Sequence, residues 1–552
     1  MGQKDGEKWT AAADLQPTIS KSDRLLVAHV KMQAFNKEWH RMSDWTAGYV
    51  ADIGYTYGYY PELNPLRVKL AFLNQGLVFP EVGTACELGF GQGLSVAMHA
   101  AASVVEWHGT DFNPAQAGYA QQLAAVSGSG ARLYDQAFDE FARRTDLPQF
   151  DYIGLHGIWS WISDENRAVI VEFIRTRLKV GGVLYISYNT LPGWAAFAPM
   201  RHLLSQHAAV MGAEGNGTLN RIDGAVDFAE KLLATNPLYS RVNTSIADRM
   251  TRLKTMPKQY LAHEYFNRDW VPMHFATMAE WLEPAKLQFA CTAHPSEQVD
   301  ALNLNAEQQQ FLKSIPDANL RESTRDFIVN QQFRRDYWVK GARKLNAIDQ
   351  AEALRLIKVV LVAYRPDISL KMTGGVGEVT LTEVIYAPLL DLLADHKPRT
   401  LGQIEQALQG KGISFAQIQQ GVTVLAGAGR LAPAQDDAVA PKLRKATDKL
   451  NTWLANQSRG SNDVGFLASP VTGGGIAVSR THQFFLLALA QGKKQPAEWA
   501  QLAWQILSLQ GQKLVKSGQA LETPEENLAE LTEMANAFAQ KQVPMLKALQ
   551  VI

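Results

Sequence analysis

The sequence predicts an α/β fold with a mostly parallel sheet, followed by a large and mainly helical region. Two observations support this prediction. Between residues 81 and 189, short apolar runs alternate with segments of helical spacing, an order typical of βαβ units. After Leu191 the strand pattern fades and apolar residues recur at helical spacing. We therefore expect one α/β domain near the start, with helical domains after it.

Composition limits the classes of function. The 552 residues include 54 Lys and Arg, 54 Asp and Glu and 46% hydrophobic residues, which at about 150 residues per domain fits three or four domains. A net charge of zero gives no basic field for nucleic acid or an anionic membrane. Two cysteines, Cys86 and Cys291, are too few for a disulfide framework or a thiolate metal site. We expect no metal and no nucleic-acid partner.

The sequence carries no recognisable targeting or membrane-spanning signal. The first twenty residues lack the apolar core of a signal peptide, and nowhere do about 18 uncharged apolar residues run together. The sequence therefore predicts a cytoplasmic protein without membrane insertion. Six regions are expected: a polar extension over 1–44 with a helix near 22–39, an α/β domain over 45–195, and accessory regions over 196–300, 301–370, 371–460 and 461–552.

The elements of the α/β domain can be placed in order. A tyrosine-rich stretch leads into a Pro-bounded helix that begins near Asn64. Gly181 and Gly182 form a tight turn from a helix into the last strand. The expected strands are 84–88, 104–111, 131–138, 150–158 and 181–189, and the helices between them run from about 91 to 102, from about 114, and from about 163 to 178.

A Gly-rich loop is the strongest local signal. In TACELGFGQG, residues 84–93, a strand ends near Glu87 and passes through Gly89, Gly91 and Gly93 into a helix. Glycines let the backbone approach a ligand closely, and the first N–H groups of a helix can bind a carboxylate or phosphate. Asp111 ends the next strand, where an acid can accept hydrogen bonds from both ribose hydroxyls.

Two cofactor classes fit this loop. A dinucleotide fold needs G-x-G-x-x-G, but Leu94 stands where the last glycine belongs. S-adenosylmethionine has no pyrophosphate, and Glu87 at the strand end can accept hydrogen bonds from its α-ammonium. The pattern resembles that of the class I S-adenosylmethionine-dependent methyltransferases, which have a Rossmann-like domain. Dinucleotide binding is the alternative.

This resemblance implies the positions of the cofactor site. The third strand would lead to residues that flank the adenine, and the fourth would end at the catalytic edge, at 155–159. The cofactor-binding residues implied in this way are Glu87, Gly89, Gly91, Asp111, Phe112, Ala137, Phe138 and His156. The Asn-Pro-Pro-Tyr type motif of many amino-group methyltransferases is absent, which disfavours a base or amide acceptor.

Three further stretches resemble a narrower group. They are GYTYGYYPELNP (54–65), LHGIWSW followed by SYNTLPGW (155–161 and 187–194), and YLAHEYFN (260–267). Together they resemble methyltransferases that carry a methyltransferase regulatory domain, a group that includes bacterial protein-lysine methyltransferases acting on an outer-membrane protein. The resemblance implies a protein substrate and lysine N-methylation. A small metabolite or glycan acceptor, or a catalytically silent binding or assembly protein, are the alternatives.

Methyl transfer to lysine needs a pocket that favours the neutral amine. A partly apolar pocket lowers the pKa of lysine, and aromatic faces attract methylammonium products. Aromatic candidates for such a pocket are Tyr55, Tyr57, Tyr59, Trp159, Trp161, Tyr188 and Trp194. The alternative is that at least half of them are core residues. We assign catalytic roles to Tyr57, His156, Trp159 and Tyr188. His156 accepts a proton or hydrogen-bonds the cofactor.

The accessory regions are expected to recognise a large acceptor and to allow a homodimer contact. Residues 196–300 form a regulatory or dimerisation region and 371–460 a winged-helix-like module of three helices and a strand. The predicted recognition helix, 414–429, has no Lys or Arg, so we interpret this module as a scaffold rather than a DNA reader. His263 and Glu264 lack the second histidine of a zinc site, and we expect them to form hydrogen bonds within the helical region.

Overall fold

The computed structural model describes residues 46, 48–212 and 217–552. The chain divides into two units, Met1–Tyr49 and Val50–Ile552, and the description below concerns the second. The predicted helix near 22–39 lies outside the described residues.

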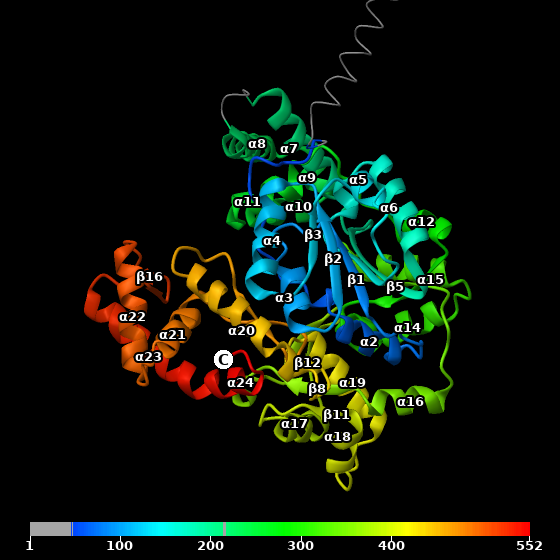
Figure 1. The fold of residues 1–552 in the computed structure, drawn as a ribbon. Coiled ribbons are helices and arrows are strands. Elements are labelled where there is room, and N and C mark those ends of the chain that lie inside the picture. Colours follow the sequence, from blue (N-terminus) through cyan, green and yellow to red (C-terminus); the bar gives the residue numbers. More distant parts are fainter. Residues whose placement is uncertain (1–45, 47, 213–216) are drawn as a thin grey trace, which may run out of the picture. The chain divides into compact units, whose positions relative to one another are not determined.

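A seven-stranded sheet forms the centre of the α/β domain (Figure 1). Its order is β3-β2-β1-β4-β5-β7-β6. The strands are β1 (Thr84–Leu88), β2 (Glu106–Asp111), β3 (Arg132–Asp135), β4 (Phe150–Leu155), β5 (Leu178–Asn189), β6 (Leu287–Thr292) and β7 (Phe333–Lys340). The first five pair in parallel, whereas β7 runs antiparallel to β5 and β6. The prediction of a mostly parallel sheet is confirmed. The strand order reverses between β1 and β4, the place where open α/β sheets bind ligands.

Strands β6 and β7 correct the expectation that residues 196–370 are helical. Both strands come from that region and complete the sheet, so the sheet does not end near residue 195. Strand β7 lacks the usual alternation of apolar and polar residues, because Arg334 and Asp336 are buried and bonded to each other at 2.8 Å. Because these charged residues pair with each other inside the sheet, the sequence of β7 does not show the alternation of apolar and polar residues that predicts a strand.

The helices of the α/β domain follow the predicted order, and their starts are capped. They are α2 (Pro65–Asn74), α3 (Leu94–Ala102), α4 (Pro114–Ser127), α5 (Phe138–Ala142) and α6 (Asp164–Arg177). The Asn64 side chain accepts a hydrogen bond from the Leu66 amide at 3.0 Å, and Pro65 occupies the first helical turn. Helix α3 begins at Leu94 rather than near Gly91, since Gly91 and Gly93 hold positive φ values of 57° and 71°.

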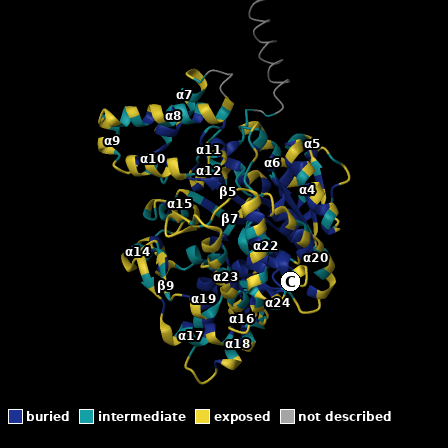
Figure 2. Cartoon of the chain, turned by 90° about the vertical axis from the view of Figure 1, so that its left-hand side faces the viewer, coloured by how far each residue is buried: buried dark blue, intermediate teal, exposed yellow. Residues whose placement is uncertain are grey.

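The region after β5 contains helices α7 (Ala198–Val210), α8 (Gly217–Ala234), α9 (Leu238–Val242), α10 (Ser245–Thr255) and α11 (Lys258–Tyr265). Apolar residues of α7, α8, α10 and α11 form one core with Trp194 and Phe197. Figure 2 shows exposed outer faces on α8 and α10, in contrast to the buried strands β5 and β7. Next along the chain come α12 (Phe275–Leu282), α13 (Asp300–Asn303), α14 (Ala306–Lys313), α15 (Ala318–Ile328) and α16 (Ala347–Arg355).

Residues 371–460 contain the three predicted helices and the strand. They are α17 (Glu383–Leu392), α18 (Leu401–Ala407), α19 (Phe415–Gly427) and β12 (Leu431–Ala434), and α20 (Ala440–Gln457) follows. Strand β12 and the short β11 (Arg399–Thr400) both pair with β8 (Lys358–Leu361), which precedes the predicted module. The module therefore begins earlier than its predicted boundary.

The C-terminal region packs on the α/β domain. It contains β13 (Phe466–Ser469), β14 (Gly474–Ala477), α21 (Arg480–Ala490), α22 (Pro496–Leu509), α23 (Pro524–Lys541) and α24 (Val543–Ala548). Leu94 and Met98 of α3 share one apolar cluster with Leu467 and Leu549. The Gly-rich stretch near residue 473 is the β13–β14 hairpin, and His99 of α3 hydrogen-bonds the Gly473 carbonyl at 3.2 Å. Among the described residues, no helix combines the length and apolarity that a membrane crossing requires.

Candidate active site

The Gly-rich loop is tied to the end of the neighbouring strand. The Gly91 amide donates to Oδ2 of Asp111 at 2.8 Å, and the Asn113 amide donates to Oδ1 of Asp111 at 3.0 Å. Gly89 has a φ of 70°, and a Cβ atom there would lie 2.5 Å from Cδ1 of Ile158. The loop therefore holds its shape only with glycine at this position, and it leaves the backbone open to a ligand.

Glu87 at the end of β1 has an unsatisfied acceptor. Its side chain is 2% exposed, and among the described residues its Oε2 atom has no hydrogen-bond partner. Burial raises the pKa of Glu87 to about 8, and the nearby charge of Asp111 adds to the shift. Burial also raises the pKa of Asp111 to about 7. A buried acceptor of this kind needs a donor, and the α-ammonium of S-adenosylmethionine would supply one.

The other predicted cofactor residues lie at the same edge of the sheet. Phe112 follows β2, Ala137 and Phe138 start α5 after β3, and His156 follows β4. The Phe138 ring is 3.7 Å from the position that a Gly89 Cβ would take. The fold thus brings together the carboxyl ends of the first four strands, as an α/β cofactor site requires. The individual cofactor contacts stay predictions.

A cavity of about 470 Å³ opens beside this edge and is called the acceptor cavity. It is lined by Tyr55, Thr56, Tyr60, His156, Asn189, Trp194, Arg249, Arg252, Met256, Tyr260, Glu264, Tyr265, Gln332 and Phe333. These residues come from the tyrosine-rich stretch, the ends of β4 and β5, helices α10 and α11, and the start of β7. Tyr55 borders the Gly-rich loop, since a Gly91 Cβ would lie 3.6 Å from its ring.

The tyrosine-rich stretch presents its side chains to two different places. Tyr55 and Tyr60 line the acceptor cavity. Tyr57 instead packs edge-on against Tyr119 of α4, with ring centroids 5.2 Å apart, and Tyr59 joins the apolar cluster of the C-terminal region. Tyr57 therefore does not line this cavity, and its catalytic role stays a prediction.

Trp159 and Tyr188 lie in the core, and their catalytic roles stay predictions. Both side chains are fully buried and neither lines the acceptor cavity. The Trp159 indole N–H points to the sulfur of Met273 at 3.4 Å, and the Tyr188 hydroxyl donates to Asp336 at 2.9 Å. They stabilise the core beneath the sheet. Of the remaining aromatic candidates, Trp194 does line the cavity.

His156 is held as a neutral ring. Its Nδ1 atom lies 2.7 Å from the Tyr185 hydroxyl, and the ring stacks on Tyr60 with centroids 3.5 Å apart. Burial lowers the pKa of His156 to about 4. A histidine with so low a pKa is a weak proton acceptor near neutral pH. The low pKa disfavours the first predicted role, proton acceptance, and the predicted hydrogen bond from His156 to the cofactor stays a prediction.

Glu264 is the cavity residue that sequence reasoning missed. It lies on α11 with its side chain in the cavity wall, beside Tyr260 and Tyr265, and no hydrogen bond of its carboxylate to the described residues is found. Burial raises the pKa of Glu264 to about 7, against a lowering effect from Arg201. Tyr260 and Glu264 are four residues apart and share one helix face, a spacing that could have revealed the site.

Comparison with known proteins identifies the family. Residues 257–340 match the family model described as predicted methyltransferase regulatory domain. The uncharacterized protein sll1526 of Synechocystis is 40% identical over 512 residues, which cover 92% of this chain and 99% of that protein. The chain belongs to the methyltransferases that carry this regulatory domain.

Solved structures share the fold of this methyltransferase. PKMT2 from Rickettsia typhi in complex with AdoHcy aligns with a TM-score of 0.65 and 18% identity, covering 90% of this chain and 99% of that one. A second structure of PKMT2 gives a TM-score of 0.61 at 16% identity. The shared fold extends over the α/β domain and the accessory regions alike, since nearly the whole of each chain is aligned.

The regulatory domain of this methyltransferase contributes residues to the wall of the acceptor cavity. Residues 257–340 include α11, which carries Glu264, and β7, which begins at the cavity residue Phe333. Strand β7 pairs with β5 from Asn189 to Val183, so the domain also completes the central sheet. The domain therefore forms part of the acceptor cavity wall.

Proposed function

We propose that this methyltransferase N-methylates lysine side chains of a protein substrate. The observation that carries the proposal is the half-buried side chain of Glu264, which lies beside tyrosines in the wall of a cavity next to the cofactor loop. Burial favours its protonated form, so its pKa lies near 7. An ionised Glu264 can bind a lysine ammonium and then accept its proton, which leaves a neutral amine.

The cavity walls suit such an acceptor. Tyr60, Tyr260 and Trp194 line the cavity, and aromatic rings in such a wall exclude water and can attract an ammonium and its methylated products. When bound, S-adenosylmethionine supplies the methyl group as a reactive sulfonium. Glu87, Asp111 and the Gly-rich loop would hold it, while Glu264 and Tyr60 orient the lysine nitrogen.

The name PKMT2 and the shared fold add support at the level of family.

Two arginines at the cavity, Arg249 and Arg252, give its wall positive charge. Arg249 lies over the Trp194 ring at 3.9 Å, which holds that wall in place. A long, flexible lysine side chain on a protein surface can reach past them to Glu264.

The test is a labelling experiment with a matched pair of variants. The full-length protein is incubated with labelled S-adenosylmethionine and a bacterial lysate, and methylated peptides are mapped by mass spectrometry. We expect label on lysine, and Glu264→Gln should lower kcat/KM by at least about tenfold, equal to about 1.4 kcal/mol, while cofactor affinity stays within about twofold. Glu280→Gln, an exposed carboxylate on α12, is the control and should behave as wild type.

Three outcomes would contradict the proposal. Label in the low-mass fraction alone would identify a metabolite or glycan acceptor. Label on protein residues other than lysine would refute the lysine assignment. Cofactor binding without transfer to any component would point to a silent binding protein.

A further inference from the structure

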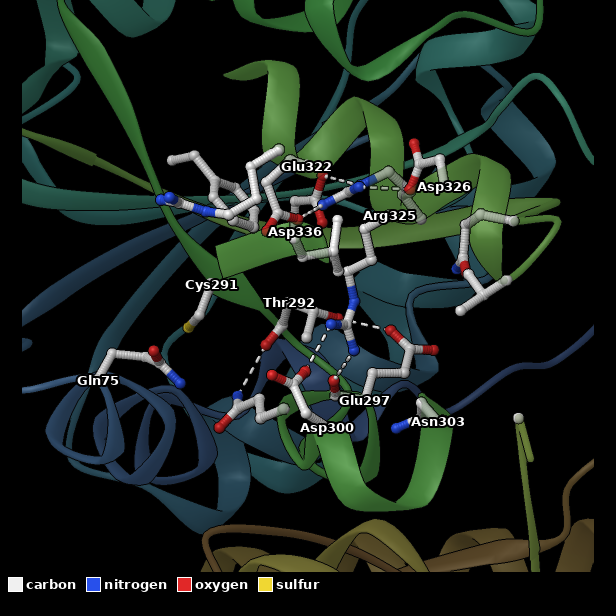
Figure 3. Close-up of a pocket in the computed structure, with 18 of the residues that line it drawn as sticks. Gln75, Cys291, Thr292, Glu297, Asp300, Asn303, Glu322, Arg325, Asp326 and Asp336 are labelled. Atoms are coloured by element: carbon white, nitrogen blue, oxygen red, sulfur yellow. Dashed lines mark hydrogen bonds and ion pairs between the residues drawn. The ribbon is translucent and has the colours of Figure 1, made fainter. Parts of the chain in front are cut away.

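A second cavity, of about 590 Å³, lies in the regulatory domain apart from the acceptor cavity (Figure 3). Its walls come from β6, β7, α15, and the segment from η5 (Pro295–Gln298) to α13. Its lining is mostly charged and polar, including Asp300, Glu322, Arg325, Asp326 and Asp336. A volume of this size accommodates a small organic molecule.

One wall holds three carboxylates, those of Glu322, Asp326 and Asp336 (Figure 3). The buried guanidinium of Arg334 contacts all three, Glu322 at 3.0 Å, Asp326 at 2.6 Å and Asp336 at 2.8 Å. Asp336 also accepts the Tyr188 hydroxyl on its Oδ2 atom. Burial raises the pKa of Asp326 to about 7 and that of Asp336 to about 6, so a second cation in the cavity would favour their ionised forms.

Two of these carboxylates have oxygens without a donor. Asp326 is 3% exposed and Asp336 is fully buried, yet among the described residues Oδ2 of Asp326 and Oδ1 of Asp336 have no hydrogen-bond partner. The Oε1 atom of Gln298, from the same cavity lining, is unpartnered too. Each buried acceptor without a donor costs about 1–3 kcal/mol. All three atoms are acceptors, so they require N–H or O–H donors.

Two arginines of α15 line the cavity, and each already donates to another group. Arg321 donates to the Ile315 carbonyl at 2.9 Å. Arg325 pairs with Asp300 at 2.6 Å and donates to the Glu297 carbonyl at 2.9 Å, on the opposite side of the cavity (Figure 3). In the part of the chain that the structure describes, no group of three His, Cys, Asp or Glu side chains could hold a metal ion. The unpaired oxygens are therefore suited to an organic cation that brings several N–H groups.

We propose that this cavity binds a small guanidinium or alkylammonium compound, whose N–H groups donate to Asp326 and Asp336. The site lies next to the acceptor cavity along one strand. Gln331 and Arg334 line the second cavity, while Gln332 and Phe333 between them line the acceptor cavity. The binding site itself does not depend on the identity of the methyl acceptor.

Calorimetry with three related probes tests the proposal on the full-length protein. L-arginine and agmatine carry a guanidinium, whereas L-citrulline has nearly the same shape without the charge. We expect heat of binding and a raised melting temperature with the first two, and at least about tenfold weaker binding of citrulline. No binding of arginine or agmatine at millimolar concentration would overturn the proposal, as would equal binding of citrulline.

Variants locate the site. Asp326→Asn should weaken agmatine binding at least about tenfold, and so should Glu322→Gln, whose half-buried side chain lies at the cavity edge and is less critical for folding. Asp227→Asn, an exposed carboxylate on α8, is the control and should bind as wild type. Thermal melting identifies a variant that fails to fold. A folded Glu322→Gln protein with wild-type agmatine affinity would refute the assignment of this cavity.

Discussion

Replacing Glu87 by glutamine is expected to stabilise the cofactor-free protein and to weaken cofactor binding at the same time. In the folded protein, burial raises the pKa of Glu87 from 4.5 to about 8. The protonated carboxyl contributes its full stability below pH 4.5, and this contribution is lost as the pH rises through 8. Glutamine is neutral at every pH, so the variant avoids the loss.

The magnitude of both effects follows from the burial of this carboxyl. Each unit of pKa shift corresponds to about 1.36 kcal/mol, so the gain in unfolding free energy should be on the order of a few kcal/mol at pH 8 and small at pH 5. Binding changes in the opposite direction. Loss of a hydrogen bond between charged groups costs about 1.5–3 kcal/mol, which weakens the affinity for S-adenosylmethionine by roughly 10- to 150-fold.

Proton release provides a specific assay. At pH 7 the free carboxyl of Glu87 is protonated, and binding of an ammonium favours its ionised form, so cofactor binding should release a proton. Calorimetry in buffers with different ionisation heats measures this release, and Glu87→Gln should reduce it. Glu81→Gln, on the exposed loop before β1, is the control. A Glu87→Gln variant with wild-type affinity, or with lower stability than wild type at pH 8, would refute the reasoning.

Three further changes test other parts of the structure. Asp111→Ala should weaken S-adenosylmethionine binding by about 1.5–3 kcal/mol in calorimetry. It should also lower the melting temperature, because two backbone amides lose their acceptor. Unchanged affinity would contradict the assignment of Asp111 to the cofactor site. Tyr60→Phe should slow methyl transfer in initial-rate assays, whereas Tyr57→Phe should not. Slower transfer by Tyr57→Phe and an unchanged rate for Tyr60→Phe would instead support the catalytic role predicted for Tyr57. Arg334→Leu should lower the free energy of unfolding by about 3–5 kcal/mol in urea denaturation, since two buried carboxylates and one half-buried carboxylate lose their cation.

The sequence predicts the first five strands and the cofactor loop well. Apolar runs such as residues 84–88 indicate a strand from neighbouring residues alone. The three glycines that follow indicate a tight strand-to-helix turn. Asp111 could be placed from its spacing alone, because strand ends of a parallel sheet meet at one edge. The hydrogen bond from Gly91 confirms that the two segments meet there.

The acceptor cavity could not be predicted in the same way. Which of the clustered tyrosines faces a cavity depends on helices that pack beside them from distant parts of the chain, as Tyr119 does against Tyr57. The strand β7 was missed because buried ion pairs replace its apolar residues. Glu264 was expected only to form hydrogen bonds within the helical region, because His263 and Glu264 lack the second histidine of a zinc site. Its helical spacing from Tyr260 is nevertheless visible in the sequence.

The packing of the C-terminal region on α3 has a consequence for synthesis of the protein. The apolar face of α3, including Leu94 and Met98, is covered by residues as late as Leu549 and Val551. At about 5–20 residues per second, a ribosome needs tens of seconds to make the intervening chain. During that time the helix behind the cofactor loop exposes its apolar face. A nascent chain of this protein should therefore be a target for chaperones, and stalled chains should fail to bind S-adenosylmethionine even when the whole α/β domain has left the ribosome.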